Sequence, residues 1–182
     1  MSPPGSRMLV LAGEKFACVK IVGRGDFTNS VEFTTVIREL RQMGLHYFVL
    51  DLSECILMDS TFLGVLAGLG LQIAQGQGDH CDEGLELLNT NARITELLEC
   101  LGVIQLFKMK QGEVNNLEQT QSVPHTAAKA TKEETTRACL EAHRTLMDVN
   151  PANVAKFKDV AQFLAEDLKR IKAEKESLES KV

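Results

Sequence analysis

The most constraining stretch of the sequence runs from Tyr47 to Leu69 and reads YFVLDLSECILMDSTFLGVLAGL. Its first part, Tyr47–Leu52, is a run of large apolar and β-branched residues, which is typical of a strand buried on both faces. From Phe62 onward the apolar residues recur at helical spacing instead. The stretch therefore predicts a buried strand and then an amphipathic helix, with the segment Asp59-Ser60-Thr61 at the junction.

The beginning of this helix is a candidate functional site. The first backbone N–H groups of a helix are unpaired, and the positive end of the helix dipole lies there. In one interpretation Asp59 or Ser60 is only an N-cap, which contributes about 1 kcal/mol. In the other, Ser60 is a phosphorylatable serine in a position that favours anions. Local chemistry alone favours the cap.

The rest of the first 118 residues alternates strand-like and helix-like patterns. Strands are expected at Met8–Leu11, Ala17–Val22, Tyr47–Leu52, Leu85–Leu88 and Val103–Met109. Helices are expected from an Asn29 cap to Gly44, from about Ser60 to Gln75, and from an Asn91 cap to Gly102. This order predicts an α/β fold: a mixed, mostly parallel β-sheet with helices packed on it.

Three carboxylates, those of Asp26, Asp51 and Asp59, follow predicted strands. The edge where parallel strands end and helices begin is the usual ligand-facing edge of such a sheet. Carboxylates there raise acid–base catalysis or a magnesium site as alternatives. The region offers no histidine, lysine or nucleophile–base pair to go with them, so an enzyme is not expected.

Charge and composition limit the remaining classes of function. Residues 1–118 contain 9 Lys/Arg and 15 Asp/Glu, a net charge of −6, whereas residues 119–182 have a net charge of +1. An acidic front part argues against nucleic acid as the main ligand, because phosphate backbones require clustered Lys and Arg. No apolar run reaches the length of a membrane span, and no signal peptide is recognisable, so we expect a cytoplasmic protein.

The five cysteines are widely spaced and form no CxxC pair, which favours reduced thiols over a disulfide framework or a zinc site. One short segment, His80-Cys81-Asp82, has ligand chemistry. Three adjacent residues do not converge easily on one metal ion, so neither a metal nor another cofactor is expected.

Three blocks of the sequence together resemble the STAS domain, the sulfate-transporter and anti-sigma-factor-antagonist family. The family pattern is an apolar strand ending in Asn or Asp, a short spacer, and Asp-Ser-Ser/Thr-Gly opening an apolar helix; here it is VLDLSECILMDSTFLGVLAGL. The turn Val22–Asp26 resembles the family's turn before its first helix. Residues Ala92–Val103 resemble its third helix and glycine-ended exit. The resemblance covers roughly residues 8–118.

The resemblance implies a small switch protein, an anti-sigma factor antagonist, rather than an enzyme. In soluble bacterial members the serine after the motif aspartate is phosphorylated by an anti-sigma factor that is also a kinase. Carried over, Ser60 is the phosphoacceptor, and Asp26, Asp51, Asp59 and Thr61 are its polar surroundings at a partner-binding surface. A carboxylate roughly 7 Å from this phosphate, at an effective dielectric near 20, repels it by about 2–4 kcal/mol. A repulsion of this size is enough to switch the binding of a partner.

Two residues of these blocks are unusual. Phe62 stands where the family usually has glycine, and three roles are open: covering Ser60, anchoring a partner, or packing into the sheet. Gly25 is the second, and it is expected to give the turn before Asp26 extra conformational freedom.

The C-terminal third reads as a helical extension. Residues 119–130 are polar and small, typical of a linker, and Thr131 opens a capping box for a helix to about Asp148. Asn150-Pro151 starts a second helix with an apolar seam, and this pair of helices, residues 131–182, cannot bury its apolar face alone. Packing within the chain, a homodimer or partner helix, and a mobile tail all remain open. The seam consists of Phe157, Ala161, Leu164, Leu168, Ile171 and Leu178.

The sequence therefore predicts a cytoplasmic STAS-domain regulator, switched by phosphorylation of Ser60 and binding an anti-sigma factor that is a serine kinase. The alternative is a non-phosphorylated scaffold domain that uses Phe62 and the helical extension for assembly in a signalling or transport-associated complex.

Overall fold

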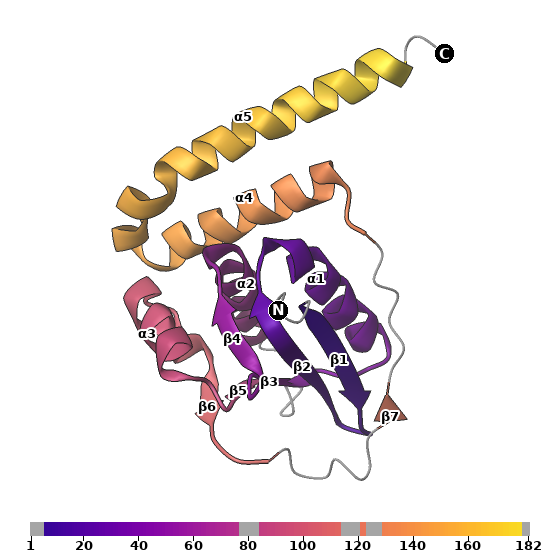
Figure 1. Ribbon diagram of the computed structural model, residues 1–182, viewed down its shortest axis with the longest axis vertical. Helices are drawn as coiled ribbons and strands as arrows, with labels where there is room; N and C mark the ends of the chain where they lie inside the picture. The colour runs from indigo at the N-terminus through magenta and orange to yellow at the C-terminus, as the bar shows by residue number, and fades with distance from the viewer. Residues whose placement is uncertain (1–5, 77–83, 114–120, 123–128, 180–182) are drawn as a thin grey trace, which may run out of the picture.

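The computed structural model describes residues 6–76, 84–113, 121–122 and 129–179, and Figure 1 shows how their helices and strands are arranged. The strands are β1 (Arg7–Ala12), β2 (Phe16–Gly25), β3 (Tyr47–Asp51), β4 (Cys55–Met58), β5 (Gly84–Leu88), β6 (Lys108–Lys110) and β7 (Gln121–Ser122). The α-helices are α1 (Phe27–Gln42), α2 (Ser60–Gln75), α3 (Ala92–Leu101), α4 (Lys132–Val149) and α5 (Val154–Glu179), and short 3₁₀ turns η1 (Ile104–Leu106) and η3 (Pro151–Asn153) accompany them.

The strands form one sheet in the order β6-β5-β3-β2-β1-β7, and β4 pairs with the last residues of β2. The pairs β2–β3, β3–β5 and β5–β6 are parallel, whereas β1 is antiparallel to both β2 and β7. The predicted α/β fold with a mixed, mostly parallel sheet is confirmed.

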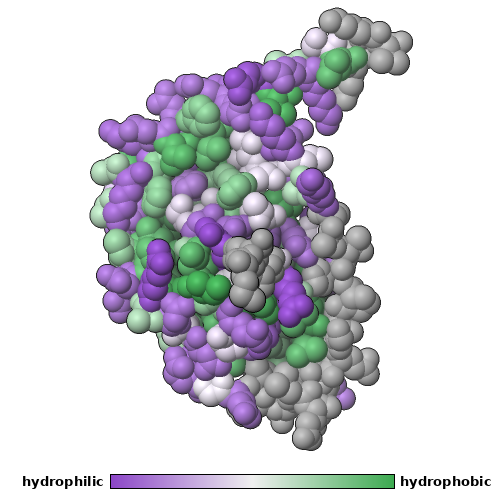
Figure 2. Space-filling view, viewed as in Figure 1, coloured by the Kyte–Doolittle hydropathy of each residue, from purple (hydrophilic) through white to green (hydrophobic). Residues whose placement is uncertain are grey.

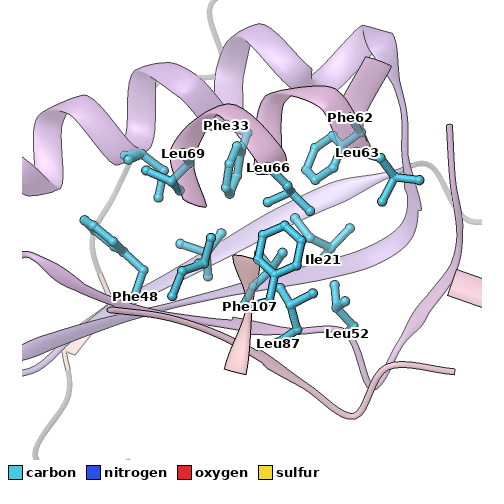
Figure 3. Close-up of a cluster of buried hydrophobic side chains, with 14 of the residues drawn as sticks. Ile21, Phe33, Phe48, Leu52, Phe62, Leu63, Leu66, Leu69, Leu87 and Phe107 are labelled. Atoms are coloured by element: carbon cyan, nitrogen blue, oxygen red, sulfur yellow. The ribbon is translucent and has the colours of Figure 1, made fainter. Parts of the chain in front are cut away.

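The main hydrophobic core lies between this sheet and the helices above it. Figure 3 shows Phe62 and Leu66 extending from α2 toward Ile21 of β2 and Leu87 of β5. All four side chains have 0% exposed surface. Burial of one such side chain stabilises the fold by about 1.5–3 kcal/mol, so this layer holds α2 firmly on the sheet.

The helix ends follow the expected chemistry with one exception. Asn91 caps α3 through its side chain, and Gly102 ends that helix with a φ of +67°, as predicted. The cap of α1 is Asp26, not Asn29: the Asp26 carboxylate accepts the N–H of Thr28 at 3.0 Å. Asn29 instead completes the capping box by accepting the Asp26 backbone N–H at 3.0 Å.

The last predicted strand is wrong over most of its length. Residues Ile104–Leu106 form the 3₁₀ turn η1, and only Lys108–Lys110 pair with β5. The turn buries Val103 completely and packs Leu106 closely against Gly70 of α2. Contacts with a helix therefore override the strand pattern of this apolar segment.

Two other expectations concern the segments that join these elements. Within the expected linker 119–130, Gln121–Ser122 form β7 and pair with Leu11 and Ala12. The polar segment 77–83, with His80-Cys81-Asp82, lies outside the described residues. The division into residues 1–118, 119–130 and 131–182 stays a prediction.

The helical extension packs on its own chain. The Thr131–Glu134 capping box opens α4, as predicted, and α5 begins at Val154 after the short turn η3. In Figure 1, α4 lies across α2 and α1, and α5 lies on the outer side of α4. The apolar seam of α5 is buried or half-buried from Phe157 to Ile171, whereas Leu178 is 68% exposed.

The outer surface carries hydrophobic residues in small groups between hydrophilic ones on the face shown in Figure 2. Of the helices that the structure describes, none has the length and apolar character needed to cross a membrane.

Candidate functional site

The site is built where β2 and β4 end and α1 and α2 begin. The carboxylate of Asp59 accepts two backbone N–H groups at 2.9 Å, one from Phe62 in α2 and one from Phe27 in α1. One side chain therefore caps α2 and also binds the first residue of α1. The backbone N–H of Asp59 donates to the carbonyl of Gly25 at 2.9 Å, which fixes this junction to β2.

Ser60 is the first residue of α2, and its hydroxyl contacts α4. The Ser60 Oγ lies 2.9 Å from Nε2 of His143, and Nδ1 of the same imidazole lies 2.7 Å from the carbonyl oxygen of Cys139. A carbonyl oxygen can only accept, so we assign the imidazole proton to Nδ1. The unprotonated Nε2 then accepts the hydrogen bond from Ser60.

His143 is enclosed by three helices. Its side chain is only 6% exposed, and its ring centroid lies 5.0 Å from that of Phe157 in α5. Ser60 itself is half-buried. A hydroxyl at a helix N-terminus is thus held by a buried base that comes from a distant part of the chain.

Thr61, the neighbouring hydroxyl, also contacts α4. It is 5% exposed, and its Oγ1 donates to Sγ of Cys139 at 3.6 Å. Burial, assisted by the nearby Asp59 carboxylate, raises the pKa of the Cys139 thiol, while the Thr61 hydrogen bond opposes the rise. The structure therefore places Ser60 and Thr61 beneath α4.

Phe62 is a core residue, so the interpretation as an exposed partner anchor is wrong. It has no exposed surface, and its ring centroid lies 5.1 Å from that of Phe33 in α1. A Cβ atom at Gly25 would lie 3.1 Å from the Phe62 ring. The two unusual residues are therefore coupled: Gly25 provides space for the Phe62 ring rather than freedom for a turn.

The third predicted carboxylate, Asp51, is used differently from Asp26 and Asp59. It lies 3.6 Å from the Lys20 ammonium and accepts the backbone N–H of Ser53 at 2.9 Å. Glu54 lies 2.7 Å from the same ammonium, and this contact raises the pKa of Lys20. Burial together with the Asp51 carboxylate raises the pKa of Cys18 to about 11.

The arrangement does not bring the three carboxylates together as metal ligands. Asp26 and Asp59 bind backbone N–H groups, and Asp51 binds Lys20. Within residues 6–76, 84–113, 121–122 and 129–179, no group of three or more His, Cys, Asp and Glu side chains has the geometry to hold a metal ion.

His143 and Cys139 are the site residues that sequence reasoning missed. A signal was present, because His143 occupies one of the helically spaced positions 136, 140, 143 and 146 that face inward in α4. That spacing shows a buried face of α4 but does not show which helix it contacts.

Comparison with known proteins identifies the fold. No protein-family model and no curated protein matches the sequence. An anti-sigma factor antagonist from Mycobacterium paratuberculosis is similar in structure, with a TM-score of 0.51 and 17% identity over 65% of this chain and 96% of that one. The anti-sigma factor antagonist SpoIIAA in its unphosphorylated form has a TM-score of 0.44 and 14% identity, over 60% and 90% of the two chains.

Proposed function

We propose that this chain, whose fold is that of the STAS domain, is a regulator of the anti-sigma factor antagonist kind, switched by phosphorylation of Ser60. The proposed partner is an anti-sigma factor that is also a serine kinase, and the proposed location is the cytoplasm. The observation that carries the proposal is the position of Ser60, which is the first residue of α2 directly after its Asp59 cap.

The chemistry around Ser60 supports a switch. A phosphate adds about 1.5 to 2 negative charges at neutral pH, and a helix N-terminus favours such a group. The cap already occupies the N–H of Phe62, and the Asp59 and Asp26 carboxylates lie at the same junction. A phosphate on Ser60 is therefore attracted by the helix and repelled by the carboxylates, so it changes the charge of this surface strongly.

We propose a regulatory role rather than catalysis for the Ser60–His143 pair. A serine beside a histidine base is also the arrangement of an activated nucleophile. Here the base lies between α2, α4 and α5, with 6% of its surface exposed and Phe157 against its ring. A substrate would have to displace α2 or Phe157 before it could contact the imidazole, which is the base of such a pair.

The test is peptide mapping by mass spectrometry of the protein isolated from its own cells under several growth conditions. We expect one phosphate on Ser60, which is lost in Ser60→Ala and retained in Ser53→Ala, an exposed serine in the turn between β3 and β4. Absence of phosphate on Ser60 in every condition would contradict the proposal.

A scaffold function without phosphorylation is the second candidate, and one observation favours it. The Ser60 hydroxyl already has a partner in His143, and the residue is half-buried. Affinity capture with Ser60→Ala and Ser60→Asp separates the two candidates: a scaffold retains the same partners in both variants, whereas a switch loses its partner in one of them.

A further inference from the structure

The helix α4 covers the site that the proposed function requires a kinase to reach. Both hydroxyls of the motif donate to α4, Ser60 to His143 and Thr61 to Cys139. These contacts join residues 83 and 78 positions apart in the sequence. The extension is thus bound to the proposed phosphorylation site itself.

Close packing between the two helices continues along α2. A Cβ atom at Gly64 would lie 2.5 Å from the carbonyl oxygen of Ala142, so only glycine allows α4 to approach this closely. Leu140, Ala142 and Leu146 of α4 are buried to 4% exposure or less. A small displacement of α4 at the Ser60 end would therefore disturb the close contact with the backbone at Gly64.

The hydrogen bond from Ser60 depends on its hydroxyl proton. Because the His143 Nδ1–H is bound to the Cys139 carbonyl, Nε2 offers a lone pair toward Ser60. A phosphate on Oγ replaces the donor with an ester oxygen and three further acceptor oxygens. The Nε2 lone pair of His143 then faces phosphate oxygens, which are also acceptors. The Asp59 carboxylate, which caps the same helix end, repels the added charge.

We propose that Ser60 and His143 form a phosphate-sensitive latch, which holds α4 on α2 while Ser60 is unmodified and releases α4 when Ser60 carries a phosphate. The proposal rests on the proposed function for the source of the phosphate. In that step a kinase transfers the terminal phosphoryl group of a nucleoside triphosphate to Ser60. The bond between Oγ and phosphorus forms, and the bond from phosphorus to the departing nucleoside diphosphate breaks. The hydroxyl proton passes to a base of the kinase. Release uncovers the face of α2 that contains Thr61 and Gly64.

The latch can be tested without the kinase. Phosphoserine is placed at position 60 of the full chain during translation, and amide hydrogen exchange of α4 is followed by mass spectrometry. Exchange in α4 is expected to be at least about tenfold faster than in the unmodified protein, while α3 is unchanged. The matched control carries phosphoserine at Ser53, which is exposed and has the same added charge, and its α4 exchange stays slow.

Unchanged exchange in α4 would overturn the proposal. Slower exchange would also overturn it, because it would mean that the phosphate strengthens the contact between α2 and α4. The variant His143→Ala sharpens the result: it should speed α4 exchange without any phosphate, and phosphoserine at position 60 should add little to it.

The native Cys139 allows a covalent check. The Oγ1 of Thr61 and the Sγ of Cys139 are 3.6 Å apart, so Thr61→Cys brings two thiols together for a disulfide between α2 and α4. Oxidation of this variant should keep α4 exchange slow even with phosphoserine at position 60, and reduction should restore fast exchange. The variant Thr61→Cys/Cys139→Ser should show no such dependence. Fast exchange that persists in the cross-linked protein would overturn the latch.

The experiments distinguish a failure of the latch from a failure of the proposed function. If cellular Ser60 never carries phosphate but installed phosphoserine releases α4, the proposed function is wrong and the latch stands. If Ser60 is phosphorylated in cells but α4 keeps its protection, the latch is wrong and the proposed function stands.

Discussion

The helices α4 and α5 follow one another in the chain, but the fold holds them in different ways. On α4, Leu140 and Leu146 are 4% and 0% exposed, and Leu146 belongs to the main hydrophobic core. On the described part of α5, Ala161 is the one buried residue. Within its seam Phe157, Leu164, Leu168 and Ile171 are half-buried, and Leu178 is exposed.

Ion pairs do not compensate for this difference. Lys132 lies 3.9 Å from Asp167 and Lys175 lies 3.8 Å from Glu133, but the two lysine side chains are 70% and 64% exposed. Surface pairs of this kind contribute about 0–1 kcal/mol. The comparison teaches that the inner face of α4 packs closely on the core, whereas α5 packs mainly on the outer side of α4.

The largest expected effect comes from leucine truncation on the two helices. Leu146→Ala should lower the free energy of unfolding by about 2–5 kcal/mol, because it leaves a cavity in the main core. Leu164→Ala on α5, where the side chain is half-buried, should cost about 1 kcal/mol. Urea denaturation followed by circular dichroism measures both, and equal losses would show that α5 is as integrated as α4.

A pair of glycines tests how closely α4 must approach α2. Gly64→Ala should destabilise the protein by about 1–3 kcal/mol, because the new methyl group meets the Ala142 carbonyl. Gly68→Ala is the matched control. A Cβ atom at Gly68 would lie 3.9 Å from its nearest neighbour, the Thr145 side chain, so alanine fits there and should add up to about 1 kcal/mol of helix stability. Thermal unfolding distinguishes them, and a stable Gly64→Ala protein would mean that the close approach is dispensable.

The N-terminal end of α4 should be sensitive to acid. The N–H of Thr131 donates to the Glu134 carboxylate at 2.8 Å, and this bond holds the pKa of Glu134 below its usual value. Because the folded-state pKa is lowered, the contribution is complete above the unfolded-state pKa and is lost as the pH falls through the folded value.

The corresponding measurement is the melting temperature at neutral pH and below about pH 4. Glu134→Gln keeps an acceptor that does not titrate, so it should show a smaller acid-induced decrease than the native protein. Glu141→Gln, an exposed carboxylate on the same helix, should leave the decrease unchanged. An identical decrease in all three proteins would contradict the role of the capping box.

The smallest effect is expected on the outer face of α5. Phe163 is 64% exposed, so Phe163→Ser should change the free energy of unfolding by less than about 0.5 kcal/mol. Light scattering on the same samples tests the predicted homodimer through the C-terminal helices. A change in mass with this variant would show that the outer face of α5 is a contact between copies.

Local patterns in the sequence predicted those parts of the fold that depend on neighbouring residues. The bounds of α2, the Asp59 or Ser60 cap and the glycine end of α3 follow from capping chemistry and apolar spacing. The pattern failed at Val103–Met109, where an apolar segment turns beneath α2 instead of extending the sheet.

For the same reason, local patterns predicted the part of the candidate site on α2 but not the part on α4. Ser60 and its acidic neighbours follow from one short motif, but His143 is 83 residues away and is not coupled to the motif by any local pattern. The coupling of Gly25 and Phe62 was visible as two unusual residues, yet only their proximity in space shows that one makes room for the other.

The covalent connection between α4 and the domain it covers has a consequence for any binding partner of α2. A molecule that binds the same face competes with a helix of the same chain, so its apparent affinity depends on the fraction of molecules in which α4 is displaced. If α4 is closed in roughly 99% of molecules, the apparent dissociation constant of that competitor rises about 100-fold. The extension thereby sets a concentration threshold: scarce or weak competitors leave the molecule closed, and only abundant or tight ones open it.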